Sequence, residues 1–208
     1  MTDDDFARLI ERGHELRGIE YKPPGKRGAG DLMAWVTRAA LGMANHRDGG
    51  IVIIGVDESG GSPRPVGLTP EELETWGYDD IAAILAACSD PTLSFEHEIR
   101  TYNGMPYVVL RVHEFAEVPI LAKKDMLGER NKQIIRKGGC YVRSLGKPET
   151  SEIPSQDEMR DLLDLAIQKG IRKFVEQAVG AGLIVYRPSP ARPASDAEFL
   201  RQLGEFLR

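Results

Sequence analysis

The stretch ANHRDGGIVIIGVDESG, from Ala44 to Gly60, decides the fold of this chain. Its apolar run, Ile51 to Val56, predicts a strand buried on both faces, because an unbroken apolar run is typical of a strand inside a sheet. The pair Gly49-Gly50 lets the chain turn tightly into that strand, and Asp57 ends it. Residues 31–45 carry apolar side chains at helical spacing and predict a helix that precedes the strand, with an asparagine that tolerates the left-handed helix-ending conformation.

The elements predicted on either side of this segment mix helices with antiparallel strands. A helix over residues 3–16 stops at Gly18, and Ile19 to Lys22 forms a short strand. The pair Asn103-Gly104 predicts a hairpin of residues 95–102 and 105–112. Further predicted elements are helices at 69–76, 80–88, 155–169 and 172–179, and a second hairpin of residues 133–136 and 140–144 around Lys137-Gly138-Gly139. We therefore expect an α+β domain over residues 1–180, with a mixed or antiparallel sheet and flanking helices. A Pro/Arg-rich linker (181–194) and a tethered C-terminal amphipathic helix (195–208) follow it.

Length and composition limit the function classes. With 208 residues, of which 41% are hydrophobic, the chain can bury one sizeable core. We expect no membrane association, since no apolar run approaches the roughly 18 to 20 residues that span a bilayer. The acidic, amphipathic beginning of the chain is unlike a secretory signal. Its two cysteines have no metal-ligand spacing, so we expect them to be reduced in a cytoplasmic protein.

Charge is distributed unevenly along the chain. The net charge is −5, yet the basic zone, defined here as Ile120–Lys147, has eight basic and two acidic residues. This zone can hold nucleic-acid phosphates, while a solvated strand-and-loop face explains it equally well. We predict that Tyr141 offers a stacking platform for a base. The basic residues that we predict to bind the nucleic acid are Lys22, Lys123, Lys124, Arg136, Lys137, Arg143 and Lys147.

Three carboxylates are candidates for a metal site. Glu15 and Glu20 would lie about 140° apart on one continuous helix, but the break at Gly18 lets Glu20 begin a strand beside the one that delivers Asp57. Such a carboxylate trio suits Mg²⁺ or Mn²⁺, which could stabilise charge on a scissile phosphate. Each acid also has an ordinary structural explanation. Glu15 could be a solvated residue of the last helical turn, Glu20 could form an ion pair with Lys22, and Asp57 could begin a turn.

A phosphate-binding loop is not evident. The two Gly-Lys pairs, Gly25-Lys26 and Gly146-Lys147, lack the earlier glycine and the following Ser or Thr that such a loop requires. We therefore identify no ATP site.

The order of these motifs resembles the Schlafen-type AlbA domain family. The resemblance covers about residues 15–163, with Leu16 where the family usually has serine, and rests on Glu15-Leu16, Glu20-Tyr21-Lys22, Ala44-Asn45, Gly49-Gly50, Gly55-Val56-Asp57 and Tyr141-Val142-Arg143. In Schlafen-like proteins that cut RNA, the matching acids form a metal-dependent endoribonuclease site for structured RNA such as tRNA. The resemblance thus implies catalytic and metal-binding roles for Glu15, Glu20 and Asp57, in a toxin or phage-defence effector. It equally allows a non-catalytic module of a transcriptional regulator or adaptor that binds RNA or DNA. Because those enzymes pair two such lobes, it also implies a homodimer, with the C-terminal helix at the interface.

Overall fold

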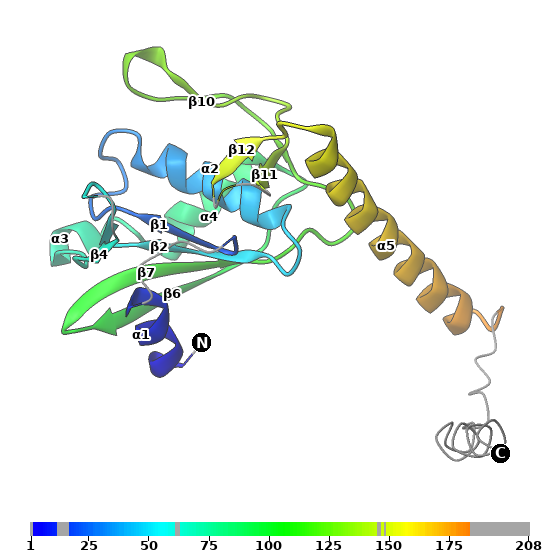
Figure 1. The fold of residues 1–208 in the computed structure, drawn as a ribbon, viewed down its shortest axis with the longest axis horizontal. Helices are drawn as coiled ribbons and strands as arrows, with labels where there is room; N and C mark the ends of the chain where they lie inside the picture. Colours follow the sequence, from blue (N-terminus) through cyan, green and yellow to red (C-terminus); the bar gives the residue numbers. More distant parts are fainter. Residues whose placement is uncertain (1, 12–16, 61–62, 145–146, 148, 184–208) are drawn as a thin grey trace, which may run out of the picture. The chain divides into compact units, whose positions relative to one another are not determined.

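A mixed four-stranded sheet in the order β1-β2-β7-β6 carries the candidate site. Its strands are β1 (Ile19–Lys22), β2 (Gly50–Ile54), β6 (Phe95–Tyr102) and β7 (Met105–Val112). The computed structural model describes residues 2–11, 17–60, 63–144, 147 and 149–183. Two units, Met1–Lys169 and Gly170–Arg208, are separately compact, and the sheet belongs to the first (Figure 1). The predicted α+β fold class is confirmed.

Helices cover both faces of the sheet. Figure 1 shows α1 (Asp3–Glu11) on one face and α2 (Leu32–Ala44) with α4 (Tyr78–Cys88) on the other. The central strand β2 supplies both cores, since Val52 and Ile54 pack toward α2 whereas Ile53 packs toward α1. This two-sided burial is what the unbroken apolar run predicts.

The register of β1 on β2 places Glu20. The two strands are parallel, with Glu20 beside Val52 and Lys22 beside Ile54. Neighbouring residues in register share a face of the sheet, so both charged side chains lie on the α2 face. The sheet continues through antiparallel pairing of β2 with β7 and of β7 with β6, around the predicted Asn103-Gly104 turn.

Gly55 interrupts the predicted strand. Its φ is +117°, and a Cβ there would lie 2.8 Å from the ring of Tyr107. Beyond it, β3 (Val56–Asp57) pairs with β4 (Arg64–Pro65) rather than with the main sheet. The run that reads as one strand is therefore two, and Asp57 belongs to a separate two-stranded ladder.

The end of α2 differs from the expectation. Asn45 has a φ of −96°, so it is not left-handed. The left-handed residues are Asp48 and Gly49, with φ values of +66° and +72°. A Cβ on Gly49 would lie 2.1 Å from the carbonyl oxygen of Val112, which explains glycine at that position.

The second predicted hairpin is wrong. Residues 137–139 do turn, but β10 (Gln133–Ile135) pairs with β9 (Met126–Leu127), and β11 (Tyr141–Arg143) pairs with β12 (Thr150–Glu152). A long loop formed by Lys123–Lys137 projects from the domain and contains β9 and β10 (Figure 1). We call this segment the basic arm. The remaining elements are α3 (Pro70–Leu73), β5 (Ser89–Asp90), β8 (Leu121–Ala122) and the 3₁₀ turn η1 (Glu129–Asn131).

One helix replaces the two predicted at 155–169 and 172–179. It is α5 (Gln156–Gly180), which continues through Gly170 and spans the boundary between the two units. The predicted helix at 195–208 lies outside the described residues. Within the described part of the chain, none of the helices has the length and apolar character needed to cross a membrane.

Candidate functional site

A pocket of about 340 Å³ lies on the α2 face of the sheet, beside Glu20. The strand β1 supplies two of its residues, α2 supplies three, and the segment entering β12 supplies the rest. They are Glu20, Lys22, Trp35, Arg38, Ala39, Glu149, Thr150 and Ser151. Two residues predicted as site residues, Glu20 and Lys22, thus lie in one pocket.

Two cations hold the carboxylate of Glu20. Its Oε1 accepts a hydrogen bond from Lys22 Nζ at 2.5 Å, and its Oε2 accepts one from Arg143 Nη1. The Glu20 side chain is only 12% exposed and that of Arg143 is fully buried. A buried ion pair of this kind requires its remaining hydrogen-bonding groups to be satisfied as well.

Arg143 meets that requirement with backbone partners. Its Nε donates to the carbonyl oxygen of Arg17 at 2.8 Å, and its Nη2 donates to that of Ile19 at 3.1 Å. The guanidinium of Arg17 donates in return to the carbonyl oxygen of Arg143. Arg143 therefore joins β11 to the beginning of β1, and its burial is at odds with the predicted contact to a nucleic acid.

Tyr141 is likewise internal. Its side chain is buried, and its hydroxyl oxygen accepts a hydrogen bond from the backbone N–H of Arg136 at 2.8 Å. Burial raises the pKa of this phenol above its ordinary value. A ring enclosed in this way cannot stack on a base, so the predicted platform is not at Tyr141.

A different aromatic ring is available at the rim of the pocket. Trp35 is half-buried, with the guanidinium carbon of Arg38 5.3 Å from its ring centroid and Nζ of Lys132 5.5 Å from it. Arg38 also lies 5.5 Å from the ring of Tyr141. Neither Trp35 nor Arg38 is among the site residues predicted from the sequence. The signal was their spacing of three, which places a tryptophan and an arginine together on an otherwise apolar helix.

Two hydrogen-bond donors of this pocket lack partners. Arg38 Nε and Ser151 Oγ are buried atoms that form no hydrogen bond within the described part of the chain. A buried donor without a partner is costly, and an oxygen atom of a bound ligand or water would satisfy it. The pocket is thus prepared to accept an oxygen-rich group.

Asp57 lies elsewhere on the domain. Its carboxylate accepts a hydrogen bond from the backbone N–H of Ser59 at 2.9 Å and one from Arg64 at 2.5 Å. The hydrogen bonds from Ser59, followed by that from Arg64, lower the pKa of Asp57 to about 2. Glu20 lies in β1 beside Val52, whereas Asp57 follows the break at Gly55 and belongs to the separate β3–β4 ladder.

The described carboxylates do not fit a shared metal ion. Glu20 and Asp57 belong to different sheets, and each already has a basic partner. No three His, Cys, Asp or Glu residues of the described ranges are grouped closely enough to hold a metal. Glu15, the third predicted ligand, lies outside those ranges. The prediction of Mg²⁺ or Mn²⁺ at this trio stays a prediction.

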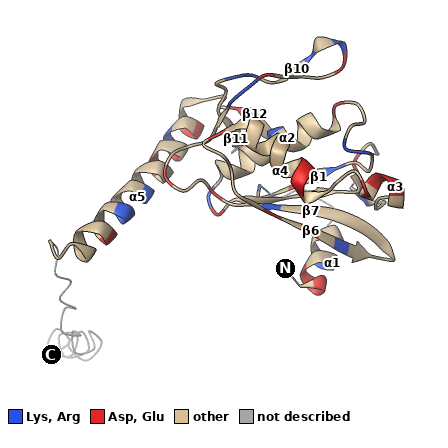
Figure 2. Ribbon diagram, turned by 180° about the vertical axis from the view of Figure 1, so that it is seen from behind, with Lys and Arg blue, Asp and Glu red and all other residues tan. Residues whose placement is uncertain are grey.

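The basic arm extends the positive charge beyond the pocket. It has six basic and two acidic residues, and Figure 2 shows basic positions along it. Lys123, Lys124 and Lys137 are exposed, as is Lys147 outside the arm. Arg136 pairs with Glu152 of β12, the neighbour of Ser151 in the pocket. The basic arm therefore carries positive charge along its length, and its Lys132 brings that charge to Trp35 at the rim of the pocket.

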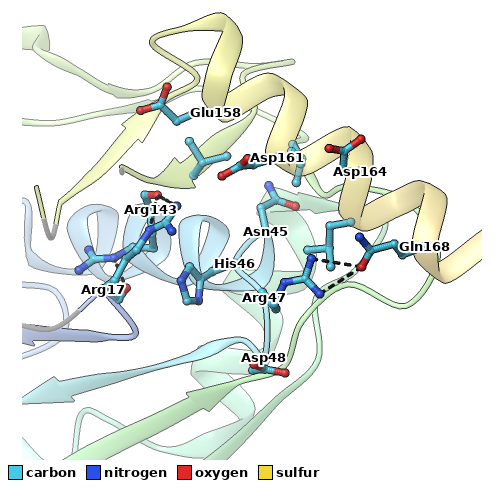
Figure 3. A pocket seen from close by; sticks show the side chains of 13 residues that line it. Arg17, Asn45, His46, Arg47, Asp48, Arg143, Glu158, Asp161, Asp164 and Gln168 are labelled. Atoms are coloured by element: carbon cyan, nitrogen blue, oxygen red, sulfur yellow. Dashed lines mark hydrogen bonds between the residues drawn. The ribbon is translucent and has the colours of Figure 1, made fainter. Parts of the chain in front are cut away.

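A second pocket, of about 400 Å³, lies between the loop after α2 and the first turns of α5. Figure 3 shows Arg17, His46 and Arg47 on one side of it and Asp161 of α5 on the other. Arg47 donates to the side-chain oxygen of Gln168 at 3.2 Å. Its walls combine four acidic side chains with the arginines Arg17, Arg47 and Arg143, so it too carries both signs of charge.

Neither Cys88 nor Cys140 forms a disulfide within the described residues. Burial raises the pKa of Cys140 to about 11 and also raises that of Cys88. A thiol with a raised pKa is a poor nucleophile at neutral pH.

Comparison with known proteins gives little beyond the fold. No family model matches the chain, and no curated protein matches it. Among solved structures, it is similar to the N-terminal domain of a protein from Nitrosomonas europaea named as related to the ATP-dependent DNA helicase RecG. The identity is 24%, with 70% of this chain and 94% of that one covered and a TM-score of 0.45. It is also similar to the DIP2311 protein from Corynebacterium diphtheriae, at 15% identity, with 66% of this chain and 22% of that one covered and a TM-score of 0.42. Likeness at this level carries no argument about activity.

Proposed function

We propose that this domain binds single-stranded nucleic acid without cleaving it, with Trp35 as the stacking surface for a base. The observation that carries the proposal is the position of Trp35, which lines a pocket and has the cations of Arg38 and Lys132 5.3 and 5.5 Å from its ring centroid. Stacking on an aromatic ring combined with a cationic path for the backbone is the usual means of binding single strands.

Three further features support this proposal. The unpaired donors Arg38 Nε and Ser151 Oγ offer hydrogen bonds to oxygen atoms of a phosphate or sugar inside the pocket. The exposed lysines of the basic arm offer a continuation for the phosphates that follow. The ion pairs of Glu20 neutralise its charge, so this acid does not repel a phosphate as a free carboxylate would.

The first prediction concerns Trp35. Replacement of Trp35 by alanine should weaken binding of a fluorescein-labelled oligonucleotide about 10- to 100-fold, because one base–aromatic stack contributes roughly 1–3 kcal/mol. Fluorescence anisotropy at fixed salt measures this. Replacement by phenylalanine, which keeps a ring, should retain most of the affinity.

The same assay has a matched charge control. Replacing Lys123 and Lys124 together by glutamine should weaken binding and reduce the salt slope by about 1.5, because two phosphate contacts are lost. Replacing the exposed Arg8 and Arg160 removes the same charge from other elements and should leave the slope nearly unchanged. Equal effects of the two pairs, or an affinity unaffected by Trp35→Ala, would contradict the proposed surface.

The family resemblance also implies a more specific activity, the metal-dependent cleavage of structured RNA. A second experiment tests this activity. Purified protein is incubated with tRNA and Mn²⁺, with Asp57→Ala for comparison. Because the described acids are engaged by Lys22, Arg64 and Arg143, we expect the wild-type protein to leave the RNA intact while still binding it. Cleavage by the wild type that Asp57→Ala abolishes would instead establish the endoribonuclease and overturn our choice of a non-catalytic role.

A further inference from the structure

The strand β6 forms an edge of the four-stranded sheet that pairs with no other strand of the described chain. It is the last strand in the order β1-β2-β7-β6, and its eight residues pair with β7 in unbroken register. It contains no proline, lysine or bulge, which are among the features that keep an exposed edge from pairing in natural sheets. The open side of β6 is therefore available to a further strand.

The hydrogen bonds to β7 show which backbone groups of β6 point outward. The carbonyl oxygen of Ser94, just before β6, accepts from the N–H of His113, just after β7. Residues of an antiparallel ladder alternate between bonding to the neighbouring strand and pointing away from it. The even-numbered residues of β6 thus bond to β7. The outward N–H and C=O groups belong to Phe95, His97, Ile99 and Thr101.

The charged side chains of β6 lie on its α1 face. Arg100 pairs with Asp3 of α1 at 3.0 Å, and Glu98, two residues earlier, shares that face. Arg100 Nε donates to Oε2 of Glu98 at 2.7 Å, whereas Oε1 of Glu98 accepts no hydrogen bond from the described residues. Ile99, on the opposite face, is 55% exposed. The edge therefore combines free backbone groups, one acid with a free oxygen and one base.

We propose that β6 pairs with β6 of a second copy of the chain, antiparallel and about a two-fold axis at Ile99. Ile99 then faces Ile99 of the second copy, and His97 faces Thr101, so that outward-pointing backbone groups meet outward-pointing ones. Glu98 faces Arg100 of the second copy, in the kind of pair whose side chains approach most closely. Because a two-fold axis makes the same surface serve both partners, this ion pair forms twice.

Charge selects this register over its neighbours. An axis one residue earlier in β6 would place Glu98 against Glu98, and an axis one residue later would place Arg100 against Arg100. Like charges directly opposite each other destabilise a pair of strands, whereas opposite charges stabilise it. The sequence of β6 is thus complementary to itself when the axis lies at Ile99.

The interface leaves the proposed nucleic-acid site free. Glu20 lies in β1, at the other edge of the sheet, and none of the residues of β6 lines its pocket. The inference is therefore independent of nucleic-acid binding. It also differs from the dimer implied by the family resemblance, in which the C-terminal helix forms the interface.

The first test is the mass of the full chain by sedimentation velocity over a concentration series. We expect a dimer, and we expect Glu98→Lys to weaken it at least about 10-fold, because both ion pairs become repulsive. Adding Arg100→Glu to this variant brings opposite charges face to face again and should restore most of the affinity. Glu96→Lys is the matched control, since Glu96 lies on the same face of β6 and would face the uncharged Tyr102 of the second copy.

The second test concerns the backbone of β6. Ile99→Pro removes the outward N–H at the axis while taking no donor from the β6–β7 ladder, so it should abolish the dimer and leave the circular dichroism spectrum of the monomer close to wild type. Ile99→Val, which keeps the N–H, should leave the dimer intact. A wild-type chain that is monomeric throughout would overturn the proposal. So would a dimer that Glu98→Lys and Ile99→Pro leave unchanged, or equal effects of Glu98→Lys and Glu96→Lys.

Discussion

Replacing Arg143 by methionine should lower the free energy of unfolding by about 3–5 kcal/mol, the usual cost of leaving one partner of a buried ion pair uncompensated. Arg143 is fully buried, and it donates to the carboxylate of Glu20 and to two backbone carbonyl oxygens. Methionine fills similar space but removes the donor to the two carbonyl oxygens and to Oε2 of Glu20, whose Oε1 still accepts from Lys22. Urea denaturation followed by circular dichroism measures the loss.

Two companion variants show whether the ion pair is the cause. Arg136→Met removes an arginine of the same basic zone whose ion pair with Glu152 is exposed, and it should change stability little. Glu20→Gln combined with Arg143→Met removes the buried negative charge, so the double variant should be more stable than Arg143→Met alone. A single variant as stable as wild type would mean that Arg143 does not join β1 to β11 in solution.

The basic zone illustrates what composition can and cannot predict. Eight basic residues in one stretch correctly indicate a region rich in positive charge, and Lys123, Lys124 and Lys137 are exposed as expected. The same count cannot separate those lysines from Arg143, whose partner, Glu20, is 123 residues away. The difference depends on tertiary pairing, which local sequence does not contain.

The same distinction explains which elements were predicted well. The Asn103-Gly104 hairpin is fixed by its own turn residues, and β2 is fixed by an apolar run that only a sheet interior can bury. The turn at Lys137-Gly138-Gly139 was also predicted correctly, with Gly138 at a φ of +77°. Its flanking strands nevertheless pair with β9 and β12, because strand pairing is decided by distant partners as well as by the turn.

The candidate site was predicted only in part. The position of Glu20 and Lys22 on one strand face follows from the alternation of a strand, and the structure brings them into one pocket. Trp35 is not among the predicted site residues, because a helical pattern does not reveal which of its members lies at an open edge. The helix α5 was predicted as two short helices, because a break was expected near Gly170, yet the helix continues through this residue.

Replacing Asn45 by aspartate should lower the free energy of unfolding by about 4 kcal/mol, although the two side chains have nearly the same shape. The buried Nδ2 of Asn45 donates to the carbonyl oxygens of Ile120 and Tyr141 at 2.8 and 2.9 Å, and its Oδ1 accepts from the N–H of Ile120 at 2.8 Å. A carboxylate keeps only the last of these bonds. It would also bury a negative charge against two carbonyl oxygens that have lost their donor.

A matched substitution separates this effect from the change of residue type. Asn103→Asp makes the same replacement at an exposed residue of the β6–β7 turn, where aspartate before glycine also suits a hairpin, so its stability should stay close to wild type. Thermal unfolding of the two variants by calorimetry gives the comparison. If both melt at the wild-type temperature, the side chain of Asn45 does not tie the end of α2 to Ile120 and β11. The link from α2 to the elements that frame the pocket would then have to come from apolar packing alone.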